Sequence, residues 1–502
     1  MGSPPVSVCM GVRNNVFRTR VGQMVALLSP LSCDIPLYPF DTYHGRSMKV
    51  IIVGAGDVGY VAAETICTVH DVLIIEKDGD VAEIVKSRLN VSVLHEDGTN
   101  PVILSHAIEM HHAEIIISTL HRDDSNLFIC MMAKRFNPEI RTIASITNPD
   151  YMIATTDQGF VGVDVIVSPE IITAEKMYYL AVVENLVDFE YMGSDLELCL
   201  AIFSVESYNR ISGQIVMNID TQGQFTIFGI YRDGGLLLSV DTMEIHPGDR
   251  ICVVGSRDGI YRFNEIVGVD DMSREFVILG GSIVGRNLAR LLSQDPKKRY
   301  VKIIDRNPEQ CRELSKSLTG VVVINSDFTE PDVQMMENVF KADCTISTSR
   351  LDDTNLLMCM SAQKFNARKV ISRYFKKEYE DIFKFTGLEC IIGYDKIVSN
   401  EITKCTISND MVILRMRSHN EVFFNHTVDG DSKLLNRYYG DLHIPDGIRI
   451  VALIREDGNE SLTIYPRMDT RICEGDRVIV FTNLTKESDL ARVFGKNVAV
   501  EL

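Results

Sequence analysis

The sequence predicts an α/β protein with two doubly wound, Rossmann-like domains, each followed by a smaller α+β domain. Three observations support this fold class. Short apolar segments of strand length alternate with helical segments of about a dozen residues, which is typical of a parallel sheet with crossover helices. A glycine-rich turn follows the first of these strands, and the order of segments recurs about 226 to 230 residues further along the chain.

Length and charge narrow the class of protein. A chain of 502 residues is too long for one core, because cores stop growing near about 250 to 300 residues. Lysine and arginine number 51 against 69 for aspartate and glutamate, which gives a net charge of -18. This acidic balance argues against a nucleic-acid partner, since nucleic-acid binders normally present a basic face.

Apolar runs and cysteines indicate the expected environment. The longest apolar runs have strand length and fall short of the roughly 18 residues that would span a membrane. The 12 cysteines are scattered without a CxxC pair. We therefore expect reduced, mostly buried thiols in a cytoplasmic protein.

An internal repeat organises the chain. The segment VIIVGAGDVG at 50–59 has a counterpart in FVILGGSIVG at 276–285. Three further pairs follow in the same order, so one unit is duplicated with short insertions and deletions. These pairs are 72–78 with 301–307, 95–104 with 324–333, and 117–137 with 346–366.

The pattern becomes rich in β-strands after each Rossmann-like half, where turn residues separate apolar runs such as FTIFGIY and RIVALIR. This change predicts four domains, and the prolines near the start predict a poorly ordered extension. The expected divisions are 1–47 for the extension, 48–185 and 274–405 for the Rossmann-like domains, and 186–270 and 406–502 for the smaller domains.

The motif GAGDVG at 54–59 carries the binding chemistry of the first half. Gly54 permits a tight turn, Gly56 lets a pyrophosphate approach the backbone, and Gly59 allows close packing of helix on strand. The phosphate would then contact the free amides of a helix N-terminus. Ala55, Asp57 and Val58 complete this expected cofactor loop.

Glu76 ends the second strand about 20 residues after the glycine loop. A carboxylate there accepts hydrogen bonds from ribose hydroxyls and repels a 2′-phosphate, which favours NAD(H) over NADP(H). We expect Lys77 to line the same edge. The alternative is a Rossmann scaffold whose nucleotide pocket has decayed.

Other residues at strand ends are expected to line the same crevice. Asp97 and Gly98 follow the third strand and would flank the adenine, while Thr119 and Leu120 follow the fourth strand and would cover the ribose or pyrophosphate. Turn and capping roles would explain the same residue types. For Asp123, Asp124 and Asn126, the capping of a helix that begins near Asn126 competes with ligand contact.

The second half departs from the glycine pattern, because GGSIVG at 280–285 places Ser282 where the backbone-approach glycine belongs. Asp305 still ends the second strand, and Asp327 and Phe328 would lie on the adenine side. Either a second nucleotide site or a purely structural copy is compatible with this pattern. The residues of the second expected loop are Gly280, Gly281, Ser282, Ile283 and Val284.

His106, His111 and His112 form the one histidine cluster that invites a metal site. No cysteine or acidic residue falls at ligand spacing beside them, so solvated histidines on a helix face are the favoured interpretation and no metal site is expected.

The combination of GAGDVG, the strand-terminal acid, HEDGTNP, STLHRDDSN and SPEIITAEKM resembles the KTN/RCK regulators of potassium transport. Because the unit is duplicated, the resemblance is to the tandem regulatory subunits of Trk-type potassium uptake systems, and it covers residues 48–502. It implies an RCK_N domain followed by an RCK_C domain in each unit.

The resemblance also implies ligands and partners. NAD(H) is the implied cofactor, with ATP or ADP as further ligands, and the loop 54–58 together with Glu76 matches the dinucleotide motif of the family. The implied partner is a membrane potassium transporter subunit of the TrkH/TrkG type, and the implied assembly is a homo-oligomer, either a dimer or a tetrameric ring. The chain would lie on the inner face of the membrane, attached through that partner.

An NAD-dependent oxidoreductase is the main alternative, since the same glycine motif serves hydride transfer. Lys77, His95 and His121 are the nearest acids or bases, but the space of a substrate domain is taken by a second Rossmann-like copy. No catalytic residue is therefore expected, and a scaffold without ligands is the third possibility.

Overall fold

The computed structural model describes most of the chain after residue 46. The predicted N-terminal extension lies outside the described residues except for position 47. The described residues are 47–149, 151, 162–192, 198–238, 240–268, 274–295, 297–406, 414–415, 421–457, 460–483 and 487–494.

The first half forms a six-stranded parallel sheet in the order β3-β2-β1-β4-β5-β6, which is the strand order of a dinucleotide-binding fold. Its strands are β1 (Lys49–Val53), β2 (Asp71–Glu76), β3 (Ser92–His95), β4 (Ile115–Ser118), β5 (Arg141–Ser145) and β6 (Val165–Val167). Its helices are α2 (Asp57–Ile66), α3 (Gly79–Arg88), α4 (Pro101–His111), α5 (Asp123–Phe136) and α7 (Pro169–Val182).

The second half repeats this sheet in the order β14-β13-β12-β15-β16-β17, so the predicted fold class is confirmed. Its strands are β12 (Glu275–Leu279), β13 (Tyr300–Asp305), β14 (Val321–Asn325), β15 (Cys344–Ser347), β16 (Val370–Tyr374) and β17 (Cys390–Gly393). Its helices are α9 (Ile283–Gln294), α10 (Pro308–Ser317), α11 (Pro331–Met336), α12 (Asp352–Lys364), α13 (Glu380–Phe385) and α14 (Tyr394–Thr406).

Strand β1 shows why these sheets are covered on both faces. Its successive side chains point to opposite faces, and all four apolar ones are buried. Val50 and Ile52 belong to one hydrophobic core, whereas Ile51 and Val53 belong to another. Burial on both faces is what turns an alternating strand into a continuous apolar run.

A smaller antiparallel sheet follows each half, with matching orders β10-β9-β11-β8-β7 and β21-β20-β22-β19-β18. The first contains β7 (Leu186–Tyr191), β8 (Leu198–Ser204), β9 (Phe225–Arg232), β10 (Gly235–Leu237) and β11 (Arg250–Ser256), with helix α8 (Arg257–Val267). The second contains β18 (Leu414–Arg415), β19 (Val422–Thr427), β20 (Ile448–Asp457), β21 (Glu460–Ile464) and β22 (Arg477–Thr482), with helix α15 (Glu487–Phe494).

The two small sheets pack against each other. The ring of Phe228 lies 5.5 Å from that of Phe423 and 5.2 Å from that of Phe481, measured between centroids. Arg449 of the second sheet donates to both carboxylate oxygens of Asp241 at 2.8 and 2.9 Å. The duplicated units therefore meet through their small domains as well as through the helices between them.

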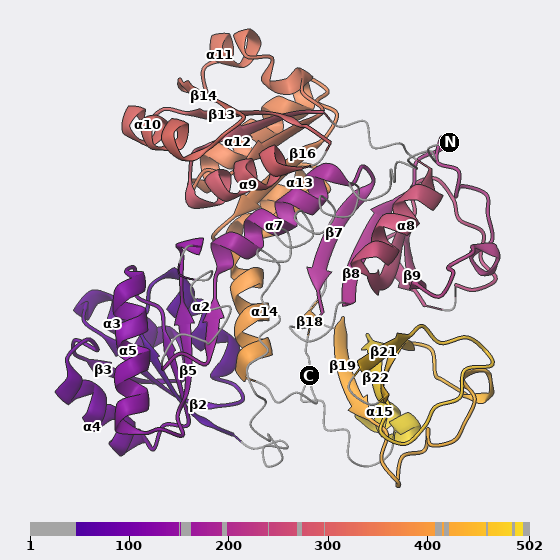
Figure 1. Ribbon diagram of the computed structural model, residues 1–502, viewed down its shortest axis with the longest axis horizontal. Coiled ribbons are helices and arrows are strands. Elements are labelled where there is room, and N and C mark those ends of the chain that lie inside the picture. The colour runs from indigo at the N-terminus through magenta and orange to yellow at the C-terminus, as the bar shows by residue number, and fades with distance from the viewer. Residues whose placement is uncertain are drawn as a thin grey trace, which may run out of the picture.

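The last helix of each Rossmann-like half lies on the sheet of the other half. Helix α14 packs against α2, and α7 packs against α9; Figure 1 shows the orange α14 beside the indigo first half. The hydroxyl oxygens of Thr65 on α2 and Ser399 on α14 lie at hydrogen-bond distance, 3.1 Å apart. Tyr178 on α7 donates to Asp295, next to α9, at 3.0 Å. This exchange was not predicted from the sequence.

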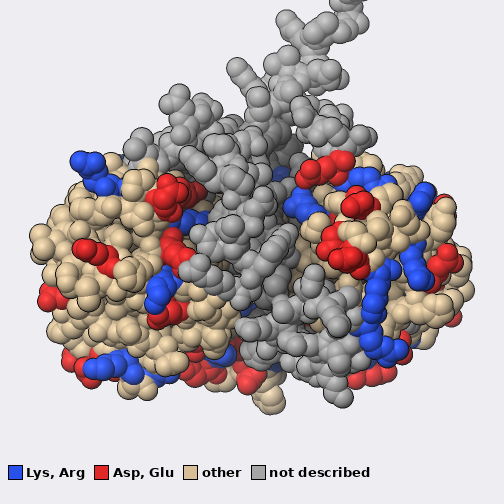
Figure 2. All heavy atoms as spheres, turned by 90° about the horizontal axis from the view of Figure 1, so that it is seen from below, with Lys and Arg blue, Asp and Glu red and all other residues tan. Residues whose placement is uncertain are grey.

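The described residues show no membrane-spanning helix, contain mostly buried thiols and carry charges of both signs on the surface. No helix of the described residues is long and apolar enough to cross a membrane. The described part of the chain contains ten free cysteines, eight of them buried. Acidic and basic side chains are interspersed over both lobes of the face in Figure 2, rather than gathered into one block.

The helix exchange can be tested by crosslinking. We expect the pair Thr65→Cys with Ser399→Cys to form a disulfide under mild oxidation, because the two native oxygens are 3.1 Å apart. The control is Thr65→Cys with Ala174→Cys, since residue 174 is the sixth of α7 as residue 399 is the sixth of α14. Mass spectrometry of the linked peptides distinguishes the pairs, and a bond to residue 174 alone would contradict the exchange.

Candidate functional site

The first glycine loop joins β1 to α2 at the point where the strand order reverses. Gly54 has a φ of +93°, which favours glycine, and its N–H donates to Ile75 O at 2.9 Å. A side-chain carbon on Gly59 would lie 1.9 Å from Gly54 O and 2.6 Å from Thr119 Oγ1. Gly59 is therefore required by the packing of α2 against the loop.

Gly56 has no comparable structural requirement. Its φ is -68°, and the nearest atom to an added side-chain carbon would be His121 Cε1, at 3.9 Å. Gly56 and Asp57 are both exposed. Gly56 is the N-cap of α2 and offers no side-chain acceptor to the first amides of the helix, so these amides face open space as an anion would need.

Glu76 is held directly beneath this loop. Its Oε2 accepts from the N–H of Ala55 at 2.7 Å, and its Oε1 accepts from the N–H of Asp78 at 2.8 Å. The side chain is only 8% exposed. Because each carboxylate oxygen has more than one lone pair, the two backbone bonds fix its orientation and leave acceptor capacity for hydroxyl groups of a ligand.

The other expected crevice residues are mostly engaged with the protein itself. The one proton of the Thr119 hydroxyl is shared between Val53 O and Gly54 O, at 3.1 and 2.9 Å, which holds the loop against the end of β4. Leu120 packs close to Gly54. Lys77 is exposed, and its carbonyl accepts from His95 Nε2 at 3.1 Å in the tautomer that carries the proton there.

Asp97 and Gly98 form the turn after β3. Asp97 Oδ1 accepts from the N–H and the hydroxyl of Thr99 at 2.9 and 2.7 Å, and these bonds, the hydroxyl first, lower the pKa of Asp97. A side-chain carbon on Gly98 would lie 2.4 Å from Val53 Cγ1. The turn therefore has a structural role whether or not it also borders a ligand.

The expectation that Asp123, Asp124 or Asn126 caps the following helix is wrong. Helix α5 begins at Asp123 and has no side-chain cap. Asp123 instead accepts from the N–H groups of Thr147 and Asn148 at 3.0 and 2.9 Å, which ties the helix start to the loop after β5. Asp124 pairs with Arg122.

Asn126 is a fully buried link between neighbouring strand ends. Its Oδ1 accepts from Leu120 N at 2.7 Å, and its Nδ2 donates to Leu120 O and Ser145 O at 2.8 and 2.7 Å. The same amide in the second half, Asn355, donates to Arg373 O at 3.0 Å. These contacts establish Ser145 and Arg373 as equivalent positions.

The second glycine loop keeps the frame of the first. The N–H of Gly281 donates to Asp305 Oδ2 at 2.6 Å, and the N–H of Asn307 donates to Asp305 Oδ1 at 2.7 Å. Gly280 has a φ of +104°, and a side-chain carbon on Gly285 would lie 2.3 Å from Gly280 O. Both carboxylates therefore hold their loops in the same way.

Ser282 changes the chemistry of the second loop. Its hydroxyl accepts from Gly285 N at 3.3 Å and donates to Thr348 O at 2.8 Å, so a side chain caps α9 where α2 is left uncapped. Of the neighbouring residues, Ile283 is exposed and Val284 is buried. The anion-binding end of α9 is partly satisfied within the protein itself.

Arg373 lies against this second loop with 2% of its surface exposed. Its guanidinium donates to Thr348 O at 2.6 Å and to Ser282 Oγ and Ser349 O at 3.3 Å each. Burial lowers the pKa of Arg373 to about 10. The sequence reasoning missed this residue, although an arginine in the position of Ser145 could have been found by aligning the two copies.

On the expected adenine side of the second half, the turn at Asp327 resembles the turn at Asp97, but Phe328 stands at the position of Gly98. Asp327 Oδ1 accepts from the N–H and hydroxyl of Thr329 at 2.9 and 2.6 Å, as Asp97 does with Thr99. Phe328, at the position of Gly98, is 6% exposed and belongs to a hydrophobic core of the second half.

The three histidines of the expected cluster lie along helix α4 and at its C-terminal end. His111 Nε2 lies 3.1 Å from Asp71 O, and His112 ends helix α4 in the left-handed conformation. Within the described ranges, no three histidine, cysteine or acidic side chains lie close enough to hold a metal ion.

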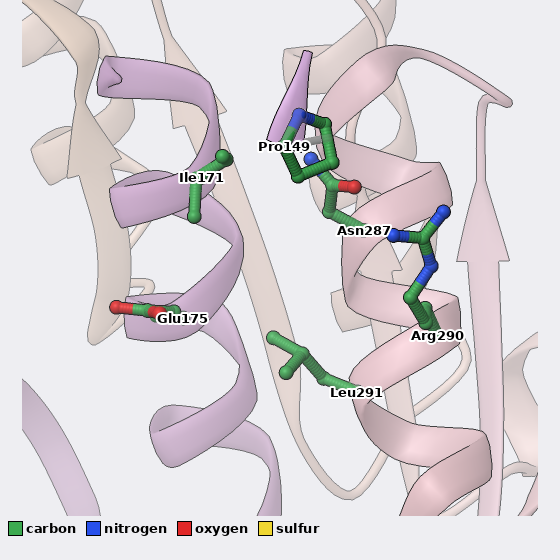
Figure 3. Close-up of a pocket in the computed structure, with 6 residues that line it drawn as sticks. All are labelled: Pro149, Ile171, Glu175, Asn287, Arg290 and Leu291. Carbon is green, nitrogen blue, oxygen red and sulfur yellow. The ribbon is translucent and has the colours of Figure 1, made fainter. Parts of the chain in front are cut away.

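A small hollow lies elsewhere, between α7 and α9. In Figure 3 the side chain of Leu291 points from α9 toward α7, while the carboxylate of Glu175 on α7 points away from α9. Burial raises the pKa of Glu175 well above its usual range. The hollow contains no residue of either glycine loop, so it is a gap in helix packing rather than part of the crevice.

One protein-family model matches the chain twice, once in each copy of the repeat. The family model of the TrkA-N domain matches residues 50–169 and 276–399, which lie in the two Rossmann-like halves. A Trk system potassium uptake protein TrkA homolog 2 from Methanosarcina mazei is 27% identical over 457 residues, covering 89% of this chain and 100% of that protein. The TrkA protein of Vibrio alginolyticus is 24% identical over 469 residues, covering 89% and 98%.

Two solved structures share the fold. The RCK domain of GsuK superposes with a TM-score of 0.58 at 17% identity, covering 90% of this chain and 95% of that one. The GsuK channel bound to NAD gives a TM-score of 0.57 at 16% identity, covering 95% and 83%. The resemblance seen in the sequence motifs is confirmed.

The two glycines Gly56 and Gly59 should separate binding from folding. We expect Gly56→Val to abolish measurable nucleotide binding, because its side chain would block the approach of the phosphate. The melting temperature should not fall, because the nearest atom to an added side-chain carbon would be His121 Cε1, at 3.9 Å. Gly59→Ala should lower the melting temperature by several degrees, because its side-chain carbon would lie 1.9 Å from a carbonyl oxygen. Calorimetry and thermal unfolding of both variants measure this, and unchanged affinity in Gly56→Val would contradict the site.

Glu76 should contribute to both affinity and stability. We expect Glu76→Ala to weaken NAD binding by about 1 to 3 kcal/mol through a lost ribose bond, and to cost a similar amount in unfolding free energy because two backbone N–H groups lose their acceptor. Asp305→Ala is the matched control in the second half, with the same loss of stability expected and no change in affinity at the first loop. Calorimetric titration of both variants with NAD measures the two affinities. An equal loss of affinity in both variants would contradict the assignment of Glu76 to the ribose.

Proposed function

Because the TrkA-N family model matches both Rossmann-like halves of the chain, we propose that the chain is a nucleotide-binding regulatory subunit of a potassium uptake system. In this proposal, NAD(H) binds at the first glycine loop of the chain and alters the arrangement of the two halves. The binding residues would be Gly54, Gly56 and Gly59 in the loop and Glu76 below it. Ala55, Asp57 and Val58 would supply the remaining loop contacts.

The observation that carries the proposal is the open position at Gly56. The N–H groups of Gly54 and Ala55 are bonded within the protein, whereas the helix start at Gly56 has no side-chain cap and glycine is not needed there for the fold. The fold would tolerate a side chain at position 56, yet the residue there is glycine. The absence of a side chain lets a phosphate approach the backbone closely. The oriented Glu76 carboxylate beside it suits a ribose.

For the outer part of the crevice, the proposal retains Lys77, Asp97, Gly98, Thr119 and Leu120 as neighbours of the nucleotide. The second loop is proposed as a weaker or purely structural site, because Ser282 and the buried Arg373 occupy its anion-binding end. The divisions at 48–185, 186–270, 274–405 and 406–502 are retained as the proposed RCK_N and RCK_C boundaries.

The proposed partner is a membrane potassium transporter subunit, which the chain would regulate from the inner face of the membrane as a homo-oligomer. Such regulation needs no bond-breaking chemistry, because a ligand with different affinities for two arrangements shifts their populations. We therefore propose no catalytic residue, and His95, His121 and Lys77 have no assigned role in proton transfer.

Titration calorimetry of the purified full chain with NADH, NAD, NADPH, ATP and ADP tests the function. We expect saturable binding of NAD(H), weaker binding of NADPH, and no loss of NADH absorbance over hours in the presence of small carbonyl compounds. Absence of binding for all five nucleotides would favour a scaffold, whereas steady oxidation of NADH would favour an oxidoreductase.

A further inference from the structure

The first glycine loop is bordered by residues of the second half. Arg350, in the loop after β15, places its Nη2 3.8 Å from Oδ2 of Asp57, the first residue of α2. The guanidinium of Arg350 also lies 5.9 Å from the ring centroid of Phe375. Phe375 in turn lies 5.0 Å from the ring of Tyr394, the first residue of the exchanged helix α14.

The ion pair between Arg350 and Asp57 contributes little to the stability of the fold. Both side chains are mostly exposed, at 67% and 69%, and exposed ion pairs at such distances add little to stability. Arg350 therefore retains most of its donors for another acceptor. A guanidinium presents five N–H donors that match phosphate oxygens.

Asp57 explains why a cation is needed there. Its carboxylate stands in the first turn of α2, where it is favourable to the helix dipole, but where it would also repel a phosphate bound at the same amides. A positive charge beside it would offset this repulsion. No residue among 54–59 carries a positive charge, and the equivalent of Arg350 in the first half is the exposed His121.

We infer that Arg350 is a phosphate-binding residue of the first nucleotide site, contributed by the second half. This inference rests on the proposed function, because it assigns the phosphate groups of the nucleotide to a second contact. On ligand binding, the guanidinium of Arg350 exchanges the Asp57 carboxylate for the phosphate oxygens while it stays near Phe375. Full affinity at the first loop then requires the second half to be in place, so the site is composite.

The test is titration of the full chain with NADH, using Arg350→Gln and the matched control Arg312→Gln. Arg312 is an exposed arginine on α10, so both variants remove one surface charge. We expect Arg350→Gln to weaken NADH binding about tenfold, Arg350→Lys to weaken it less, and Arg312→Gln to leave it unchanged. All three should unfold at the same temperature as the parent chain.

Each outcome has a distinct meaning. If the parent chain does not bind NADH, the proposed function fails. If the parent binds and Arg350→Gln binds as tightly as Arg312→Gln, the composite site is wrong while the proposed function stands. If Arg350→Gln loses affinity together with thermal stability, or Arg350→Lys loses as much affinity as Arg350→Gln, the role is structural and the assignment of a phosphate contact is overturned.

Discussion

The crevice depends on one interaction, the bond between a strand-end carboxylate and the second amide of the glycine loop. Ala55 donates to Glu76 in the first half, and Gly281 donates to Asp305 in the second. The preceding glycine must have a positive φ for this amide to point at the carboxylate, and the following helix must start close to the strand, which Gly59 and Gly285 permit. The glycine turn, the helix start and the strand-end carboxylate therefore depend on one another.

Both copies retain this arrangement of loop and carboxylate. They differ in whether a side chain caps the N-terminus of the following helix. The first copy leaves the terminus uncapped at Gly56 and supplies charge from outside, through Arg350. The second copy caps its helix with Ser282 and buries the guanidinium of Arg373 against the same loop. A few substitutions therefore suffice to leave the helix N-terminus open in the first copy and to occupy it with protein groups in the second copy.

The sequence predicted whatever depends on local chemistry. The roles of Gly54 and Gly59 follow from turn geometry and side-chain size, and the alternation of strands and helices follows from apolar periodicity, all of which are encoded within short segments of sequence. The exchange of α7 and α14 could not be predicted, because it depends on contacts between residues far apart in the sequence, such as Thr65 and Ser399. Asn126 was misjudged for a related reason, since its partners Leu120 and Ser145 become neighbours only when β4 and β5 pair.

The exchange of helices gives the first site its mechanical importance. Because α14 contributes Tyr394, Val398 and Ile402 to the core of the first half, the two halves cannot separate without exposing apolar surface, so a ligand could change their arrangement only through a shift along the helix contacts. A ligand held only by the first half would be indifferent to such a shift. A ligand held by both halves has different affinities for different arrangements, and this difference is the only free energy with which binding can act on a distant partner.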